Sequence, residues 1–177
     1  GDAGYLTTND KKVYEKVIEL RNHGMVDRNK IKNFGYVSRM DNLQAAVLNY
    51  RLKNLNKVIN IRRKNVDLYK KYLNNDFIFI PDEKKYQFNT YHTFVVQLDK
   101  RDKLREYLFK NNITTTIHYP IPIHLQPAAK KLGYKKGSFK MAEKQATRIL
   151  TLPINQFLQE KHIIKISEKI NKFYTKN

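Results

Sequence analysis

The residues best equipped for chemistry are gathered in one short segment, His118-Tyr119-Pro120-Ile121-Pro122-Ile123-His124. Two prolines in three residues keep the backbone extended and remove hydrogen-bond donors, which predicts a rigid segment at the surface. In the strand expected just before it, His118 shares a face with Thr114 and Thr116 rather than with the isoleucines. This favours an imidazole available for binding. The alternative, a core histidine bound to a backbone carbonyl, stays open.

Metal binding and nucleophilic catalysis have less support. His118 and His124 have no third His, Cys or carboxylate in their segment, and ligand sets normally need three or four donors, so we predict no metal site. The sequence has no Cys and no Ser in a glycine elbow, which argues against a covalent nucleophile. Its few glycines form neither a phosphate loop nor a dinucleotide fingerprint.

The net charge of +19, from 35 basic and 16 acidic residues, predicts attraction for anions. Nucleic acid, acidic lipid head groups and phosphorylated small molecules all fit that sign. The lysines are spread over nearly every segment, so a solvated basic surface explains them equally well. No apolar run approaches the ~18 residues that a bilayer span requires. The absence of Cys favours a reducing compartment, and we expect a cytoplasmic protein.

The longest predicted element runs from Asp41 to Leu73. Asp41 and Gln44 have the form of an N-cap and capping box, and neither Gly nor Pro interrupts the residues that follow. Apolar residues recur there at three- and four-residue steps, which predicts one amphipathic helix of about 50 Å. A helix of that length usually joins two bodies or forms part of a subunit contact.

The residues before this helix predict a short helix and a loop. Asn9 or Asp10 can cap a helix that continues through Leu20, and Gly24 suits the position just after its end. Residues 25–34 are polar and basic and show no periodicity, so we expect a loop.

The residues after Leu73 predict an α+β fold. Strands are expected at residues 77–80, 91–98 and 113–119, and helices from an Asp99 cap to residue 112 and at 125–132, 138–150 and 158–174. Together they would form a small, mostly antiparallel sheet covered by helices.

Several longer motifs resemble one known family. In chain order they are GDAG at 1–4, LTTND at 6–10, LRNHG at 20–24, GYVSRMDNLQAA at 35–46, HYP at 118–120, HLQP at 124–127, LGY at 132–134 and LPI at 152–154. Motifs of the same kind occur in the same order in nucleotide-sugar aminotransferases of the DegT/StrS type. The resemblance extends from the first residue to the last helix.

This resemblance implies a fold-type I enzyme that depends on pyridoxal 5'-phosphate. Such enzymes move an amino group, usually from glutamate, to a keto group of a nucleotide-linked sugar, and they are homodimers with shared active sites. Residues 1–40 would then be the tail of the large cofactor-binding domain, residues 41–73 a connecting helix, and residues 74–177 the C-terminal small domain. Family chains are about twice as long, and the Schiff-base lysine would lie upstream of Gly1. We therefore expect the chain alone to be inactive, because the cofactor's chemistry needs that amine.

The resemblance also implies which residues bind the cofactor. Asp2 would lie in a loop close to it. Ser38 and Arg39 would reach the cofactor phosphate from the neighbouring subunit, where a guanidinium suits oxyanions. Many relatives carry Asn in place of Val37, which cannot donate a hydrogen bond. Ser38 and backbone groups would replace that contact, or the phosphate would be held less tightly.

Substrate binding is implied for four residues. Arg39 would also face the substrate. His118 and Tyr119 would line the sugar side of the pocket and hydrogen-bond the sugar, and His124 would belong to the same wall, with a supporting role.

Two alternatives from other classes remain. A basic nucleic-acid-binding module would use Lys and the 12 Tyr as an electrostatic and stacking surface, although those Tyr fall mostly at helical core spacing. A catalytically silent scaffold would follow if the 177 residues were the entire gene product.

Overall fold

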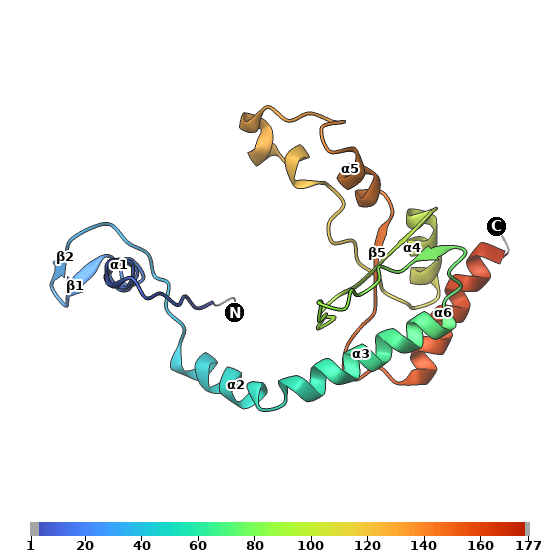
Figure 1. Ribbon diagram of the computed structural model, residues 1–177, viewed down its shortest axis with the longest axis horizontal. Helices are drawn as coiled ribbons and strands as arrows, with labels where there is room; N and C mark the ends of the chain where they lie inside the picture. Colours follow the sequence, from blue (N-terminus) through green and yellow to red (C-terminus); the bar gives the residue numbers. More distant parts are fainter. Residues whose placement is uncertain (1–3, 176–177) are drawn as a thin grey trace. The chain divides into compact units, whose positions relative to one another are not determined.

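The structure is a computed structural model that describes residues 4–175. These residues form two compact units, divided between Leu55 and Asn56 (Figure 1). The mixture of helices with a small antiparallel sheet confirms the predicted α+β class. The predicted domain limits at residues 40 and 73 stay a prediction.

The first unit begins with helix α1 (Lys11–Leu20). Its N-terminus is capped by Asp10, whose Oδ1 accepts hydrogen bonds from the N–H groups of Lys12 (2.7 Å) and Val13 (3.3 Å). The predicted start of this helix is confirmed. Gly24 follows its end with a positive φ of 74°, a conformation that glycine adopts without strain.

A two-stranded ribbon replaces the loop that we predicted over residues 25–34. Strands β1 (Met25–Asp27) and β2 (Lys30–Ile31) pair in antiparallel fashion. The prediction was wrong because β2 is fully exposed and β1 nearly so, and the pairing depends on backbone hydrogen bonds. Such a ribbon produces no alternation of apolar and polar residues.

Residues 35–38 return along the C-terminal end of α1. A Cβ atom on Gly35 would lie 2.3 Å from the backbone nitrogen of Gly24, so only glycine permits this close approach. The returning segment delivers Arg39 to the end of α1. Three backbone hydrogen bonds fasten it: Tyr36 N–H to Leu20 O (2.7 Å), His23 N–H to Tyr36 O (2.9 Å) and Ser38 N–H to Arg21 O (2.9 Å).

The single helix predicted over residues 41–73 is divided in two. Helix α2 (Asn42–Leu52) and helix α3 (Leu55–Tyr72) are separated by a turn at Lys53 and Asn54. Asn54 N–H donates to Arg51 O (3.0 Å), one residue closer than in an α-helix. The prediction was wrong because Lys and Asn break no pattern, and Asn is only a weak helix former. Asp41 occupies the N-cap position of α2 without a side-chain capping bond.

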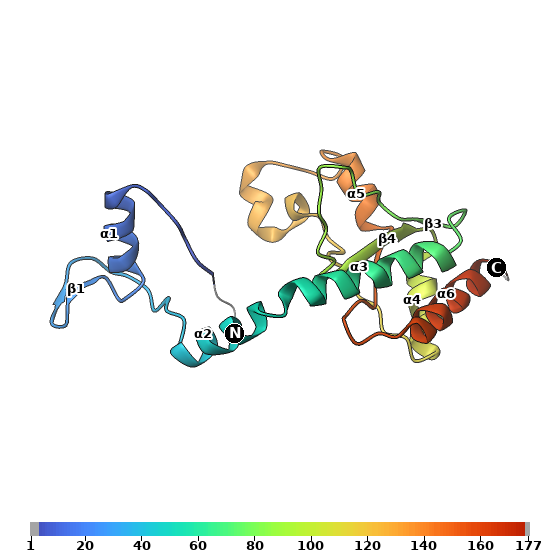
Figure 2. The same cartoon turned by 60° about the horizontal axis from the view of Figure 1, so that its bottom comes forward.

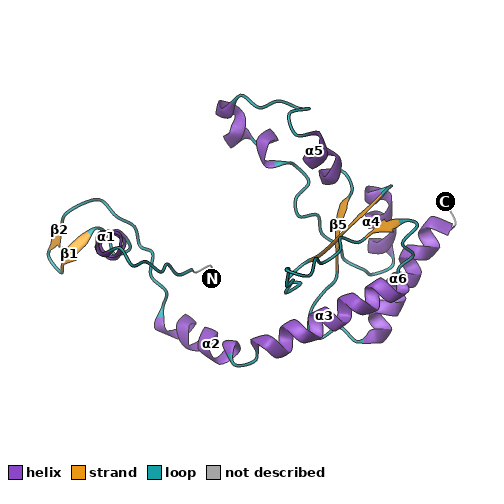
Figure 3. Cartoon of the chain, viewed as in Figure 1, coloured by secondary structure: helices purple, strands orange, loops and turns teal. Residues whose placement is uncertain are grey.

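The second unit is built on a three-stranded antiparallel sheet, whose strands are orange in Figure 3. The strand order of the sheet is β3-β4-β5. Its strands are β3 (Ile78–Phe79), β4 (Phe94–Leu98) and β5 (Ile149–Leu152). Val96 lies opposite Leu150 and Phe94 opposite Leu152, so these apolar side chains point to the same face.

Helices α3, α4 (Arg101–Lys110) and α6 (Glu160–Thr175) share the core with that face of the sheet, and α4 lies beside α6 (Figure 2). Tyr69 on α3 is fully buried and donates its hydroxyl hydrogen to Pro153 O at 2.9 Å. Burial raises the Tyr69 pKa well above its ordinary value. The last helix, predicted over residues 158–174, buries Ile163, Ile166, Ile170 and Phe173 in this core. The buried cluster consists of Val66, Tyr69, Leu73, Ile78, Phe94, Val96, Leu98, Leu104, Leu108, Ile113, Leu150, Leu152, Ile163, Ile166, Ile170 and Phe173.

Two predicted elements of this unit differ from the structure. Residues 113–119 form no strand, and Thr116 makes only an isolated bridge to Thr151. The helix predicted over residues 138–150 is shorter, α5 (Lys140–Ala146), because the last residues of that span extend and pair with β4. Both errors concern pairing between residues far apart in the chain, which local periodicity does not report.

Two predicted helix boundaries also change. Lys100 takes the N-cap position of α4 with a φ of 53°, and Asp99 forms an ion pair with Arg148 in place of a cap. The helix predicted at 125–132 is a pair of 3₁₀ turns, η1 (Ile123–Leu125) and η2 (Pro127–Leu132). Proline at the start of η2 lacks an N–H, which prevents a continuous helix through this region.

Candidate functional site

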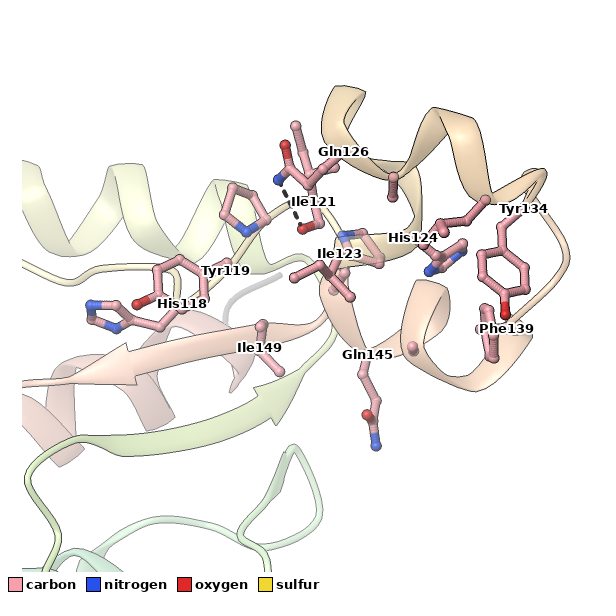
Figure 4. A pocket seen from close by; sticks show the side chains of 16 residues that line it. His118, Tyr119, Ile121, Ile123, His124, Gln126, Tyr134, Phe139, Gln145 and Ile149 are labelled. Atoms are coloured by element: carbon pink, nitrogen blue, oxygen red, sulfur yellow. Dashed lines mark hydrogen bonds between the residues drawn. The ribbon is translucent and has the colours of Figure 1, made fainter. Parts of the chain in front are cut away.

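The second unit contains a cavity of about 850 Å³ lined by the whole segment from His118 to His124 (Figure 4). Its walls are mainly apolar, which is typical of small-molecule sites. Figure 4 shows His118 and Tyr119 at one end of the cavity and His124, Tyr134 and Phe139 gathered at the other.

His118 is held in place by strand β5. Its Nδ1 lies 2.9 Å from the Thr151 hydroxyl oxygen. Because Leu150 and Leu152 point into the core, Thr151 projects from the opposite face of the strand, where the histidine lies. Nδ1 is thus bonded to a side chain, and Nε2 has no hydrogen-bond partner among residues 4–175. The ring is half-buried and contacts Tyr119 edge to face at 5.4 Å, while the Tyr119 side chain is largely exposed.

His124 lies at the end of the cavity away from His118 (Figure 4). Only 6% of its side chain is exposed, and its Nε2 lies 3.0 Å from Glu143 Oε1 on α5. The Phe139 ring packs against the imidazole at 4.8 Å. Its buried position agrees with a supporting role, while its predicted part in substrate binding stays a prediction.

Glu143 is a residue of this site that the sequence analysis missed. The hydrogen bond from His124 lowers the pKa of the Glu143 carboxyl, and the N–H groups of Gly137 and Phe139 act in the same direction. One signal was available: Glu143 is the only acidic residue between Lys130 and Arg148. An isolated carboxylate in a basic stretch indicates a specific partner.

A second cavity, of about 670 Å³, lies in the first unit around Arg39. Arg21 and Arg28 line it with Arg39, together with Asn22 and His23. Three guanidinium groups around one hollow suit the oxygens of a phosphate group. The fold creates this cluster because residues 35–38 lie along the end of α1.

The remaining predicted cofactor residues have different positions. Ser38 is exposed, and its carbonyl oxygen accepts a hydrogen bond from Arg21 Nε at 3.4 Å. Val37 is 69% exposed, and its backbone bridges to that of Asn22. Asp2 lies outside the described residues. The structure thus brings Ser38 and Arg39 together in one unit, and His118, Tyr119 and His124 together in the other.

The structure also bears on metal and membrane binding. Within residues 4–175, no group of three or more His, Asp or Glu side chains is placed to hold a metal ion. The same residues contain no helix with the length and apolarity needed to cross a membrane.

The fold of the two units and the motifs around both cavities are those of sugar aminotransferases. The crystal structure of DesV from S. venezuelae matches this chain with a TM-score of 0.85 at 31% identity, over 94% of this chain and 45% of that one. Residues 1–171 match the DegT/DnrJ/EryC1/StrS aminotransferase family, and the chain belongs to that family of pyridoxal-phosphate-dependent enzymes. The predicted resemblance is confirmed.

Curated relatives agree with this assignment. A "pleiotropic regulatory protein" of Geobacillus stearothermophilus is 36% identical over 98% of this chain and 48% of its own length. The dTDP-3-amino-3,6-dideoxy-alpha-D-galactopyranose transaminase of Aneurinibacillus thermoaerophilus is 34% identical over 97% of this chain and 47% of its own. The chain therefore spans about half the length of the curated relatives that it matches.

Proposed function

We propose that this chain is part of an aminotransferase that moves an amino group from glutamate to a keto group of a nucleotide-linked sugar. The observation that carries the proposal is the family match over residues 1–171, in which the HYP motif of the family type lines the large cavity. Relatives named as sugar-nucleotide transaminases support the substrate class.

The residues around Arg39 fit the phosphate of pyridoxal 5'-phosphate or of the substrate. Arg21, Arg28 and Arg39 supply the positive charge, and their hydrogen-bond donors match phosphate oxygens. When bound, the cofactor supplies the electron sink that lets an amino group be taken from one substrate and given to another. The chain's own residues bind and orient the reactants.

On the sugar side, His118 presents Nε2 while Thr151 holds Nδ1. The ring orientation is thereby set, and either tautomer leaves Nε2 able to donate or to accept a hydrogen bond from a sugar hydroxyl. Tyr119 contributes an exposed phenol hydroxyl beside it. The neighbouring walls of the cavity are mainly apolar, as in other small-molecule sites.

Further parts of the proposal concern the whole protein. No Lys in this chain matches the family's cofactor-anchoring motif, so that lysine would come from residues outside the 177. The chain would then provide the C-terminal small domain, and a homodimer would complete each site with Ser38 and Arg39 of a second copy. A cytoplasmic location stays a prediction.

The test is an assay of the protein that contains both halves of the family fold. With glutamate and a panel of dTDP-, UDP- and GDP-linked keto sugars, we expect an amino sugar from at least one of them. The 177-residue chain alone should give no product and no absorbance band from lysine-bound cofactor. Such a band at one cofactor per chain would contradict the assignment of the lysine to another segment.

The same protein can be used to test the alternative function, nucleic-acid binding. Binding to DNA or RNA that weakens steeply with salt, with no discrimination among nucleotides and no transamination of any keto sugar, would replace the proposed function.

A further inference from the structure

We propose that Glu143 is a positioning residue: through His124 it fixes the wall that presents His118 and Tyr119. This inference rests on the proposed function for its substrate, but its geometry belongs to residues 118–151. The wall is clamped at two ends. His118 is bonded to Thr151 at one end, and His124 to Glu143 at the other, at 2.9 and 3.0 Å respectively.

The first step of the argument is that the Glu143 carboxylate joins three pieces of chain. Its own backbone lies in α5. The N–H of Gly137 donates to both of its oxygens, at 2.7 and 2.9 Å, and the N–H of Phe139 donates at 3.4 Å. With His124 as a further donor, one carboxylate ties the turn before α5 to the segment that lines the cavity.

The second step is that His124 has little freedom to move. Its side chain is 6% exposed and that of Glu143 is 15% exposed, so water competes weakly for the hydrogen bond between them. The Phe139 ring covers the imidazole at 4.8 Å, and Tyr134 packs on Phe139 at 5.1 Å. A buried hydrogen bond to an ionised group is stronger than an ordinary one.

The third step is that the chain between the two clamps is stiff. Pro120 and Pro122 fix their φ angles. The turn at η1 is closed by hydrogen bonds from Leu125 N–H to Pro122 O (2.9 Å) and from Gln126 Nε2 to Ile121 O (3.4 Å). If His124 moves, Tyr119 and His118 therefore move with it, because the segment between them does not bend to compensate.

The substitution Glu143→Gln isolates this role. Gln has nearly the same size, but it presents an NH₂ group where the carboxylate accepts a hydrogen bond. With its NH₂ group at the Oε1 position, His124 and the Phe139 N–H face a donor; with that group at the Oε2 position, the Gly137 N–H faces one. In both orientations the acceptor loses its negative charge. The Glu106→Gln variant is the matched control, since Glu106 on α4 is 66% exposed, is ion-paired with Lys110 at 2.7 Å, and does not line the cavity.

In the protein with both halves of the fold, we expect Glu143→Gln to raise the KM for the nucleotide sugar about tenfold, as for the loss of one charge-assisted hydrogen bond. The affinity for the cofactor should stay unchanged, and so should both constants in Glu106→Gln. An unchanged KM in Glu143→Gln would overturn the proposal. A loss of kcat that only follows the loss of folded protein, with KM constant, would overturn it as well.

A second pair of variants keeps the test valid if Glu143→Gln folds poorly. His124→Gln places an amide donor near the position of Nε2, whereas His124→Leu fills the space without a donor. We expect His124→Leu to raise the KM for the nucleotide sugar more than His124→Gln does, because only Gln can still donate a hydrogen bond to Glu143. Equal KM values in these two variants would contradict a role for the hydrogen bond.

A measurement that needs no substrate tests the positioning role of Glu143 independently of the proposed function. The ring ¹⁵N and ¹³C resonances of His118 should shift in Glu143→Gln and not in Glu106→Gln, because the wall has moved at its far end. This holds even if no keto sugar is aminated. Unperturbed His118 resonances in Glu143→Gln would overturn the positioning role, while a perturbed His118 in a protein without transaminase activity would refute only the function.

Discussion

At the scale of single residues, neighbours decide what each candidate can do. Arg39 is exposed, and by itself it would be an ordinary surface arginine. Arg21 and Arg28 line the same hollow, which supports the proposal that Arg39 binds a phosphate group. His118 likewise depends on Thr151, whose hydroxyl occupies one ring nitrogen and leaves the other available.

We predict that Arg39→Ala weakens binding of the cofactor phosphate or of the substrate about ten- to a hundredfold in the complete protein, as expected for charged hydrogen bonds. Stability should hardly change, because an exposed side chain is removed. Cofactor titration, KM and thermal unfolding would measure these effects. Arg105→Ala, an exposed arginine on α4, is the control. Kinetics identical to those of the natural protein would exclude Arg39 from the site.

At the scale of elements, helix α3 holds the loop between β3 and β4. Arg63 makes two hydrogen bonds to the Glu83 carboxylate, at 2.8 and 2.7 Å, and one to Asn89 O at 2.8 Å. Its guanidinium also lies 4.6 Å from the centre of the Phe88 ring. This clamp orders a segment that has little regular secondary structure of its own.

We predict an acid-sensitive contribution of this clamp to stability. The hydrogen bond from Arg63, with that from the Asn89 N–H, lowers the pKa of Glu83 to about 2 from an ordinary value of 4.5. The unfolded chain therefore takes up this proton at a higher pH than the folded one. The contribution is complete above about pH 4.5 and is lost as the pH falls towards 2.

Denaturant unfolding between pH 2 and 7 tests this expectation. The free energy of unfolding should fall less steeply with decreasing pH in Glu83→Gln than in the natural sequence. Glu168→Gln, at an exposed position on α6, should keep the natural slope. Parallel profiles for Glu83→Gln and the natural sequence would show that the clamp adds no acid-sensitive stability.

At the scale of the whole molecule, the first unit exposes much apolar surface. Helix α2 buries none of its residues, and Leu43, Tyr50 and Leu52 are 77%, 70% and 64% exposed. Leu43 and Tyr50, seven residues apart, share one face of this helix and Leu52 lies on the opposite face, so apolar side chains are uncovered on both. The exposure supports the proposal that further polypeptide, from the rest of the protein or from a second copy, covers this helix.

We therefore predict that the 177-residue chain self-associates in solution. Sedimentation velocity should show species larger than a monomer that increase with concentration. The double substitution Leu43→Glu and Leu52→Glu should shift the distribution towards monomer, because charge at the apolar surface opposes association. Phe157→Glu, at an exposed position of the second unit, is the control. A chain that stays monomeric at every concentration would contradict the prediction.

Many candidate residues of the site could be predicted from sequence, because they lie in short motifs of neighbouring residues. The HYP motif at 118–120 and the motif at 35–46, which contains Ser38 and Arg39, are each continuous in the chain. The turn at Lys53 and Asn54 could not be predicted, since neither residue interrupts a helical pattern. The position of β5 could not be predicted either, because it depends on pairing with β4, some fifty residues earlier.

The sequence by itself determined the family, the α+β class and the segment that bears His118 and Tyr119, because motif, cap and periodicity are properties of neighbouring residues. The tertiary structure decided which charges meet. Only folding places Glu143 against His124, and Arg39 around one hollow with Arg21 and Arg28. These arrangements depend on hydrogen bonds and close backbone approach between segments that are separate in the chain. No local sequence pattern encodes how close two such segments come in the folded protein.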